Sequence, residues 1–136
     1  MEKPYPNLFS PIRLGSREAV NRIMRTATTT NLAERGHATD AMIEFYRVLA
    51  RGGAGTIVTE AFRVHRSVAF VSGISLFDRN AIPGLQRLAN VVRAEQGLFI
   101  VQLFHGDDNI SAAAFQRIYG LLPLLLALTA AESRTR

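Results

Sequence analysis

The feature that most constrains the fold is an alternation of short β-type apolar runs with amphipathic helical segments. Strands are predicted over residues 21–27, where Arg25 weakens the pattern, over 56–61, and from 98 to 103 in "LFIVQL". Helices are predicted between them, the first beginning at Thr39 and the second near residue 82. The order strand, helix, strand, helix, strand favours parallel strands joined by right-handed crossovers.

The two helical segments carry recognisable start and stop signals. The Thr39 hydroxyl can cap the first helix, Gly52-Gly53 can end it, and Gly97 can end the second. Each segment has an apolar stripe at helical spacing: Met42, Phe45, Tyr46 and Leu49 in the first, and Leu85, Leu88, Ala89 and Val92 in the second. These stripes predict that both helices pack against a sheet.

Loop lengths bear on the architecture. The long polar segments, 28–38 and 62–80, follow strands, whereas the turns from helix to strand are short. A doubly wound open sheet and part of a (β/α)₈ barrel both place ligands at these strand ends, and the loop lengths favour the barrel. The run from Leu98 is typical of a strand buried on both faces, although it contains an amide, Gln102.

Composition excludes several classes of protein. The chain has 136 residues, of which 48% are hydrophobic and 20% charged, and this is typical of one globular domain. It has no cysteine, and its net charge of +5 comes from arginines scattered along the chain without a run. We therefore expect no nucleic-acid partner. The longest apolar stretch, residues 118–131, is too short to span a bilayer and contains Pro123, so we expect no membrane association.

Small and polar residues gather where the predicted strands end. Thr26, Ala27 and Thr28 close the first strand, Ala61 closes the second, and Gln102 lies near the end of the third. A small alanine would let a flat ring approach the backbone, and a carboxamide offers both a donor and an acceptor to an imide or pyrimidine edge. The alternative is that the threonines reflect β-propensity and that a loop backbone satisfies the glutamine.

Other catalytic and binding motifs are missing from the sequence. The histidines at positions 37, 65 and 105 fall on separate strand–helix units without metal-ligand spacing, so we expect no metal. The glycines of "RGGAGTIV" precede a strand and do not join a strand to a helix, so they do not form a dinucleotide fingerprint.

Three stretches, in this order and spacing, resemble the Old Yellow Enzyme family of NADH:flavin oxidoreductases. They are "NLFSPIRLGSREAVNRI", "TDAMIEFYRVLARGGAGTIVTEAFRV" and "IVQLFHG". The resemblance covers the N-terminal part of a family member. It implies an α/β fold, namely about three βα units of an FMN-binding (β/α)₈ TIM barrel, which is incomplete here because a full barrel takes about 250 residues.

The resemblance also implies a function and a site. Family members hold FMN at the carboxyl ends of the strands, reduce it with NAD(P)H and pass hydride to activated alkenes such as α,β-unsaturated carbonyls. Transferred onto this sequence, the cofactor-binding residues are Thr26, Ala27, Thr28, Ala61 and Gln102. The partner is then a small, enone-like molecule, and we expect a cytoplasmic location.

The sequence departs from the family pattern in two places. Ala27-Thr28 stands where many relatives have Pro-Met, and Asp107-Asp108-Asn109 stands where the family has Gly-Arg. We therefore predict a barrel part over residues 1–106 and a divergent tail without family match over 107–136. The catalytic proton donor belongs to later strands in the family, so no catalytic residue is predicted in this chain.

Two hypotheses about the function follow from the resemblance and from these departures. The first is an FMN-dependent oxidoreductase whose chain is a truncated or frame-shifted product that retains FMN weakly or not at all. The second is an inactive α/β fragment, or a small interaction module, without a cofactor. The colour of the purified protein distinguishes the two hypotheses, because only the first predicts a flavin absorbance band.

Overall fold

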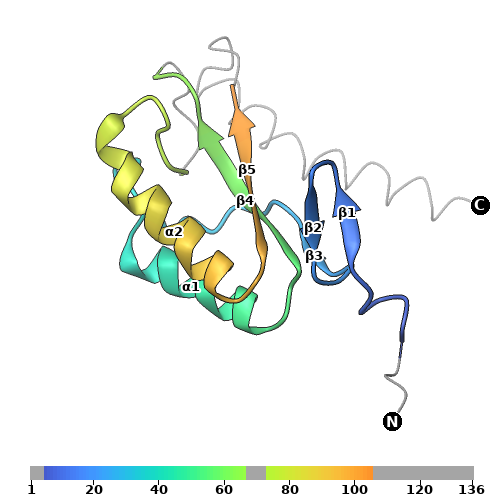
Figure 1. The fold of residues 1–136 in the computed structure, drawn as a ribbon. Helices are drawn as coiled ribbons and strands as arrows, with labels where there is room; N and C mark the ends of the chain where they lie inside the picture. The colour runs from blue at the N-terminus through green and yellow to red at the C-terminus, as the bar shows by residue number, and fades with distance from the viewer. Residues whose placement is uncertain (1–4, 67–72, 106–136) are drawn as a thin grey trace, which may run out of the picture. The chain divides into compact units, whose positions relative to one another are not determined.

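The computed structural model describes residues 5–66 and 73–105. The chain divides between Gly106 and Asp107, and all described residues belong to the first unit. Its centre is a three-stranded parallel sheet in the order β3 (Met24–Arg25), β4 (Thr56–Arg63) and β5 (Leu98–Phe104). The helices α1 (Asp40–Arg51) and α2 (Ile82–Ala94) connect these strands and lie on the same side of the sheet (Figure 1).

The local signals for α1 are confirmed. The Thr39 hydroxyl oxygen accepts a hydrogen bond from the Met42 amide at 3.1 Å, which satisfies one of the free N–H groups of the first turn. The helix ends at Arg51, and Gly53 then adopts a φ of +88°, a left-handed conformation that glycine takes without strain. A short 3₁₀ turn, η1 (Arg79–Ala81), leads into α2.

The core lies between the helices and the sheet. It contains buried side chains from α1, β4 and α2, together with Ile74 and Ala81 from the segment before α2. Its members are Met42, Ile43, Tyr46, Ala50, Ile57, Phe62, Ile74, Ala81, Leu88 and Val92. The predicted stripes therefore do pack on the sheet, with Phe45, Leu49 and Leu85 at the border of the core.

Two strand predictions need correction. The first strand is only Met24–Arg25, not 21–27, because the carbonyls that follow it bond to the Arg25 guanidinium and leave the ladder. The run from Leu98 is not buried on both faces. Phe99 and Val101 pack toward the core, whereas Ile100 and Gln102 are exposed, because in the described part of the chain the helices cover one face of the sheet.

An antiparallel hairpin, β1 (Ile12–Leu14) and β2 (Arg17–Ala19), precedes the sheet and was not anticipated from the sequence. In Figure 1 the hairpin lies to the right of the sheet, and the helices lie to the left of the sheet. Its turn contains Gly15 with a φ of +60°. Strands of three residues are too short to show a period-2 pattern, so the hairpin could not be predicted from periodicity.

The Asn21 side chain fixes the start of β3 against the turn between α1 and β4. Its amide nitrogen donates to the Gly53 carbonyl at 2.8 Å, and its oxygen accepts from the amides of Ile23 and Gly55 at 3.0 Å each. A Cβ on Gly55 would lie 2.5 Å from that oxygen. These contacts hold the start of β3 against the start of β4.

Candidate functional site

A bulge in β4 sets the geometry of the predicted site. Val58 pairs with Ile100, and the next pair is Ala61 with Gln102, so Thr59 and Glu60 together face one residue of β5. The extra residue shifts the alternation by one position. Ile57 and Phe62 therefore both contribute to the core although five positions separate them. Ala61 consequently falls on the face opposite the helices.

The structure brings two of the predicted residues side by side. Ala61 and Gln102 are register partners on adjacent parallel strands, close to the carboxyl ends of both. Ala61 is half-buried and Gln102 is exposed. A small side chain next to an exposed carboxamide can accommodate a flat heterocycle that presents both donors and acceptors.

The other predicted residues, Thr26 to Thr28, follow β3 at the same edge of the sheet. Thr26 and Thr28 are exposed and Ala27 is half-buried, so their exposure alternates as in a strand. Arg25 holds this segment, because its guanidinium donates to the Thr26 carbonyl at 2.7 Å and to the Thr28 carbonyl at 3.1 Å. The five predicted residues thus lie on three neighbouring strands or directly after them.

A buried acid, Glu60, lies behind this edge. Its side chain is 1% exposed, and one carboxylate oxygen, Oε2, accepts a hydrogen bond from the Thr30 amide. The other oxygen, Oε1, is buried without a hydrogen-bond partner among the described residues. The Glu60 backbone N–H donates to the Tyr46 hydroxyl at 3.0 Å. The position of Glu60 beside Ala61 at the end of its strand could be predicted from the sequence, but its hydrogen bond to Thr30 could not.

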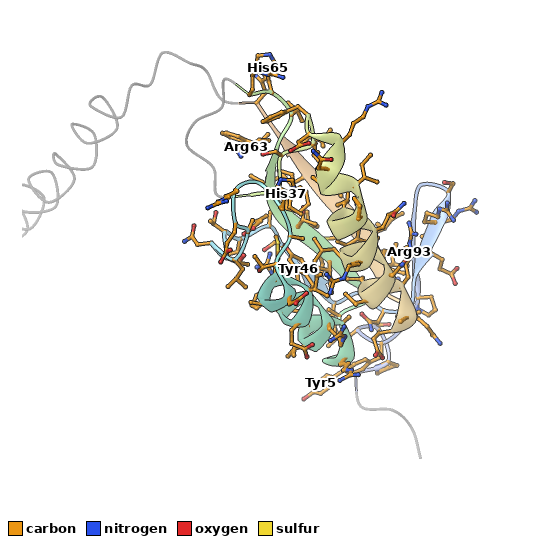
Figure 2. The ribbon with its side chains drawn as sticks, turned by 90° about the vertical axis from the view of Figure 1, so that its left-hand side faces the viewer. Tyr5, His37, Tyr46, Arg63, His65 and Arg93 are labelled. Atoms are coloured by element: carbon orange, nitrogen blue, oxygen red, sulfur yellow. The ribbon has the colours of Figure 1, made fainter. Side chains whose placement is uncertain are left out.

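Tyr46 connects α1 to the bulge. It is fully buried, on the side of α1 that faces the sheet (Figure 2). Burial raises the pKa of Tyr46 above its ordinary value of 10.0, and the nearby Glu60 charge raises it further. The hydrogen bond from the Glu60 backbone and the Arg25 charge act in the opposite direction. The phenol is therefore a neutral anchor at physiological pH.

Two histidines, His65 and His105, follow the carboxyl ends of β4 and β5, at the same end of the sheet as the predicted site. The rings of His65 and His105 lie 5.9 Å apart after β4 and β5, and His37 lies 3.4 Å from the Asp78 carboxylate. Figure 2 shows His65 beyond Arg63, the last residue of β4. Among residues 5–66 and 73–105, no three His, Asp or Glu side chains are grouped as a metal site would require.

Neither α1 nor α2 is long and apolar enough to cross a bilayer.

Solved structures of known enzymes share this arrangement. A 2-naphthoyl-CoA reductase in complex with 2-naphthoyl-CoA matches with a TM-score of 0.71 and 32% identity, over 75% of this chain and 16% of that one. An Old Yellow Enzyme homologue from Zymomonas mobilis matches with a TM-score of 0.66 and 29% identity, over 74% of this chain and 28% of that one. These neighbours are TIM-barrel enzymes, and the described residues form an open part of such a barrel.

Curated relatives agree with this match. A metal reductase of Desulforamulus reducens is 42% identical over 106 residues, which are 78% of this chain and 16% of the relative. A 4,4'-dithiodibutanoate disulfide reductase of Rhodococcus erythropolis is 37% identical over 108 residues, which are 75% of this chain and 25% of the relative. The chain thus spans a quarter or less of the length of these two proteins.

The profile of one protein family matches most of the sequence. The match covers residues 7–118, which include both helices, all three strands of the parallel sheet and every predicted site residue, and it continues past Gly106. The chain therefore belongs to the NADH:flavin oxidoreductase / NADH oxidase family.

Proposed function

We propose that this chain provides the first part of the FMN site in an NAD(P)H-dependent oxidoreductase of the Old Yellow Enzyme type, located in the cytoplasm. The observation that carries the proposal is the register of β4 and β5, which places Ala61 beside Gln102 at the carboxyl edge of a parallel sheet. In parallel α/β folds this edge is where ligands bind. Membership of a flavin oxidoreductase family supports a flavin as the ligand.

The residues at this edge suit the isoalloxazine of FMN. The exposed Gln102 carboxamide can donate to and accept from the pyrimidine part of the ring system. Ala61 leaves room for a planar group beside the backbone. The segment from Thr26 to Thr28 offers hydroxyls and backbone groups from the adjacent strand. When bound, FMN would accept hydride from NAD(P)H and pass it to an activated alkene such as an enone.

The contribution of this chain is to bind and orient the ring. We propose no catalytic proton donor within residues 1–106, because in the family this donor lies on later strands of the barrel. The division into a barrel part, 1–106, and a divergent tail, 107–136, also stays part of the proposal; the tail lies outside the described residues, and the family match extends into it as far as residue 118.

Titration with FMN tests the proposal. Quenching of FMN fluorescence by the purified chain is expected to be saturable, but too weak for the flavin to be retained through purification. Gln102→Leu should weaken binding about tenfold, because it removes one hydrogen-bonding group from the ring. Gln86→Leu, an exposed position on α2, is the matched control and should leave the affinity unchanged. Absence of saturable quenching, or equal affinities of the wild type and Gln102→Leu, would overturn the proposal and favour a fragment without cofactor.

A further inference from the structure

The bulge in β4 connects all three segments of the proposed FMN site. Thr59 Oγ1 donates to the Glu60 backbone carbonyl at 2.8 Å and accepts a hydrogen bond from the Gln102 backbone N–H at 3.1 Å. The same bulge points the Glu60 carboxylate at the Thr30 amide, next to the segment from Thr26 to Thr28. Bulges beside functional sites commonly redirect a side chain in this way.

The segment after β3 is held from two sides. Arg25 binds its carbonyls, at Thr26 and Thr28, and also donates to the Val58 carbonyl of β4 at 3.3 Å. Glu60 binds its N–H at Thr30. A cation on the carbonyls and an anion on the amide together fix the conformation of a segment that makes few ladder bonds of its own.

A buried glutamate at position 60 is expected to lower the stability of the folded chain. A carboxylate that is 1% exposed loses its hydration, and its Oε1 gains no hydrogen bond from the described residues in exchange. An apolar side chain would fill the same space at a lower cost in stability. The benefit of Glu60 is therefore expected in the conformation of the segment that it binds, and not in the stability of the core.

We propose that Glu60 is a positioning residue for the flavin: through Thr30 it holds the segment 26–30 in the conformation that receives the ring. The Tyr46 hydroxyl, which accepts the Glu60 backbone N–H, keeps the bulge in place from the helix side. This inference rests on the proposed function, and it assigns the role of preparing the site to a residue that does not itself contact FMN.

The main test replaces the carboxylate by an apolar side chain of similar length. In Glu60→Met we expect the free energy of unfolding without FMN to stay equal or rise, while the FMN dissociation constant increases at least about tenfold. The hydrogen-exchange rate of the Thr30 backbone amide, measured by NMR without FMN, should also increase about tenfold. A merely structural role would instead lower the stability of the protein together with its affinity.

Two further variants complete the experiment. Glu60→Gln keeps an acceptor but loses its charge, so we expect a two- to threefold weaker affinity and a similar change in exchange at Thr30. Glu44→Met, at an exposed position of α1, is the control and should change neither quantity. Unchanged exchange at Thr30 and unchanged affinity in Glu60→Met, or in Glu60→Gln if the methionine variant does not fold, would overturn the proposal.

The two proposals can fail separately. If the wild-type chain binds no FMN, the proposed function fails, and the positioning role toward the flavin fails with it. Exchange at Thr30 would still report whether Glu60 holds the segment. If the wild type binds FMN and Glu60→Met binds it equally well, only the positioning role is wrong.

Discussion

The two faces of the parallel sheet differ sharply. On the face toward the helices, Ile57 and Phe62 are completely buried among residues of α1 and α2. On the opposite face, Met24 and Ile100 remain 46% and 38% exposed, and Gln102 is exposed as well. One face is a closed hydrophobic core, and the other presents apolar and amide groups at the surface of the described unit.

The two faces therefore differ in how much they contribute to the stability of the unit. Burial of apolar area against the helices supplies the free energy that holds the unit together. The opposite face contributes less to that free energy, and it carries the residues that we propose bind the ligand. The bulge in β4 separates the two sets of residues, because it assigns Phe62 to the core and Ala61 to the opposite face.

A matched pair of isoleucine substitutions tests the comparison most strongly. Ile57→Ala on the packed face should lower the free energy of unfolding by about 2–5 kcal/mol, because it leaves a cavity in the core. Ile100→Ala on the exposed face should cost less than about 1 kcal/mol. Urea unfolding followed by far-UV circular dichroism measures both values. Equal costs would show that the second face is also covered in solution, and the comparison would no longer hold.

Tyr46→Phe tests the link between the helices and the bulge, with a smaller expected effect. Removing the hydroxyl leaves the buried Glu60 N–H without its acceptor and should cost about 1–3 kcal/mol at neutral pH. The same urea titration measures this loss. A cost near zero would show that the Glu60 amide finds another acceptor.

Comparison of the wild type with Tyr46→Phe also tests how the free energy of unfolding depends on pH. Because burial raises the pKa of Tyr46, the folded protein keeps the phenol proton at pH values where the unfolded chain has lost it. The stabilisation from the neutral phenol is therefore complete below pH 10.0 and declines as the pH rises above it. Stability of the wild type should fall more steeply above pH 10 than stability of Tyr46→Phe. Parallel curves would contradict the raised pKa.

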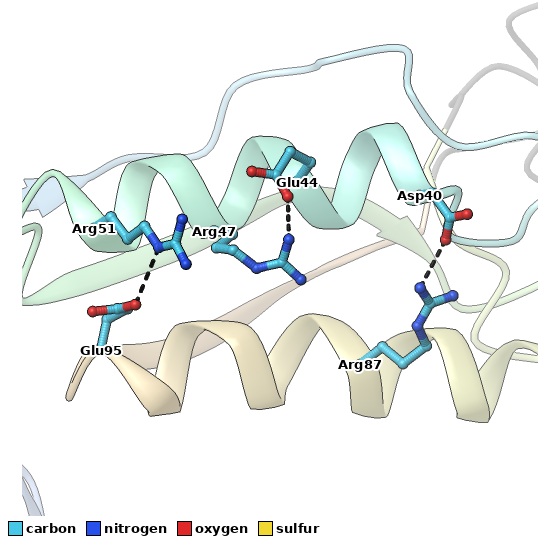
Figure 3. Close-up of polar contacts among 6 residues, drawn as sticks. All are labelled: Asp40, Glu44, Arg47, Arg51, Arg87 and Glu95. Atoms are coloured by element: carbon cyan, nitrogen blue, oxygen red, sulfur yellow. Dashed lines mark hydrogen bonds and ion pairs between the residues drawn. The ribbon is translucent and has the colours of Figure 1, made fainter.

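The smallest effect is expected on the outer surface of the helices. Asp40 pairs with Arg87 at 2.7 Å and Arg51 pairs with Glu95 at 3.4 Å, and both pairs join α1 to α2 (Figure 3). The Arg87 and Asp40 side chains are 58% and 89% exposed, so water screens their attraction. Arg87→Gln should cost at most about 0.5 kcal/mol, and high salt should remove the difference. A larger loss that persists in high salt would mean that the aliphatic part of Arg87 packs against the helices.

Local signals predicted the helices well and the strands less well. The Thr39 cap, the glycines after Arg51 and the apolar stripes act within a few residues, so they can be read directly from the sequence. The first strand was drawn too long, because its end depends on Arg25 binding carbonyls that lie after it. The hairpin from Ile12 to Ala19 was missed, since its strands are too short for a periodic signal.

For the site, the sequence indicated which residues lie at the ends of the strands, and the structure shows how they are arranged. Ala61 and Gln102 could be assigned to the ends of two strands, but their pairing depends on a one-residue bulge that no pattern in the sequence reveals. The roles of Glu60 and Arg25 were hidden for the same reason. Both bind backbone atoms of other segments, and such contacts exist only after the chain has folded.

Local patterns in the sequence were enough to predict the alternation of strands and helices, the faces that the helices bury and the family that the chain resembles. These follow from periodicity, capping and motifs, which are properties of neighbouring residues. The face that Ala61 occupies and the groups that hold the segment after β3 could be seen in the folded chain alone. Those features depend on register and on hydrogen bonds between residues about 30 or more positions apart, from Arg25 to Val58, from Thr30 to Glu60 and from Thr59 to Gln102.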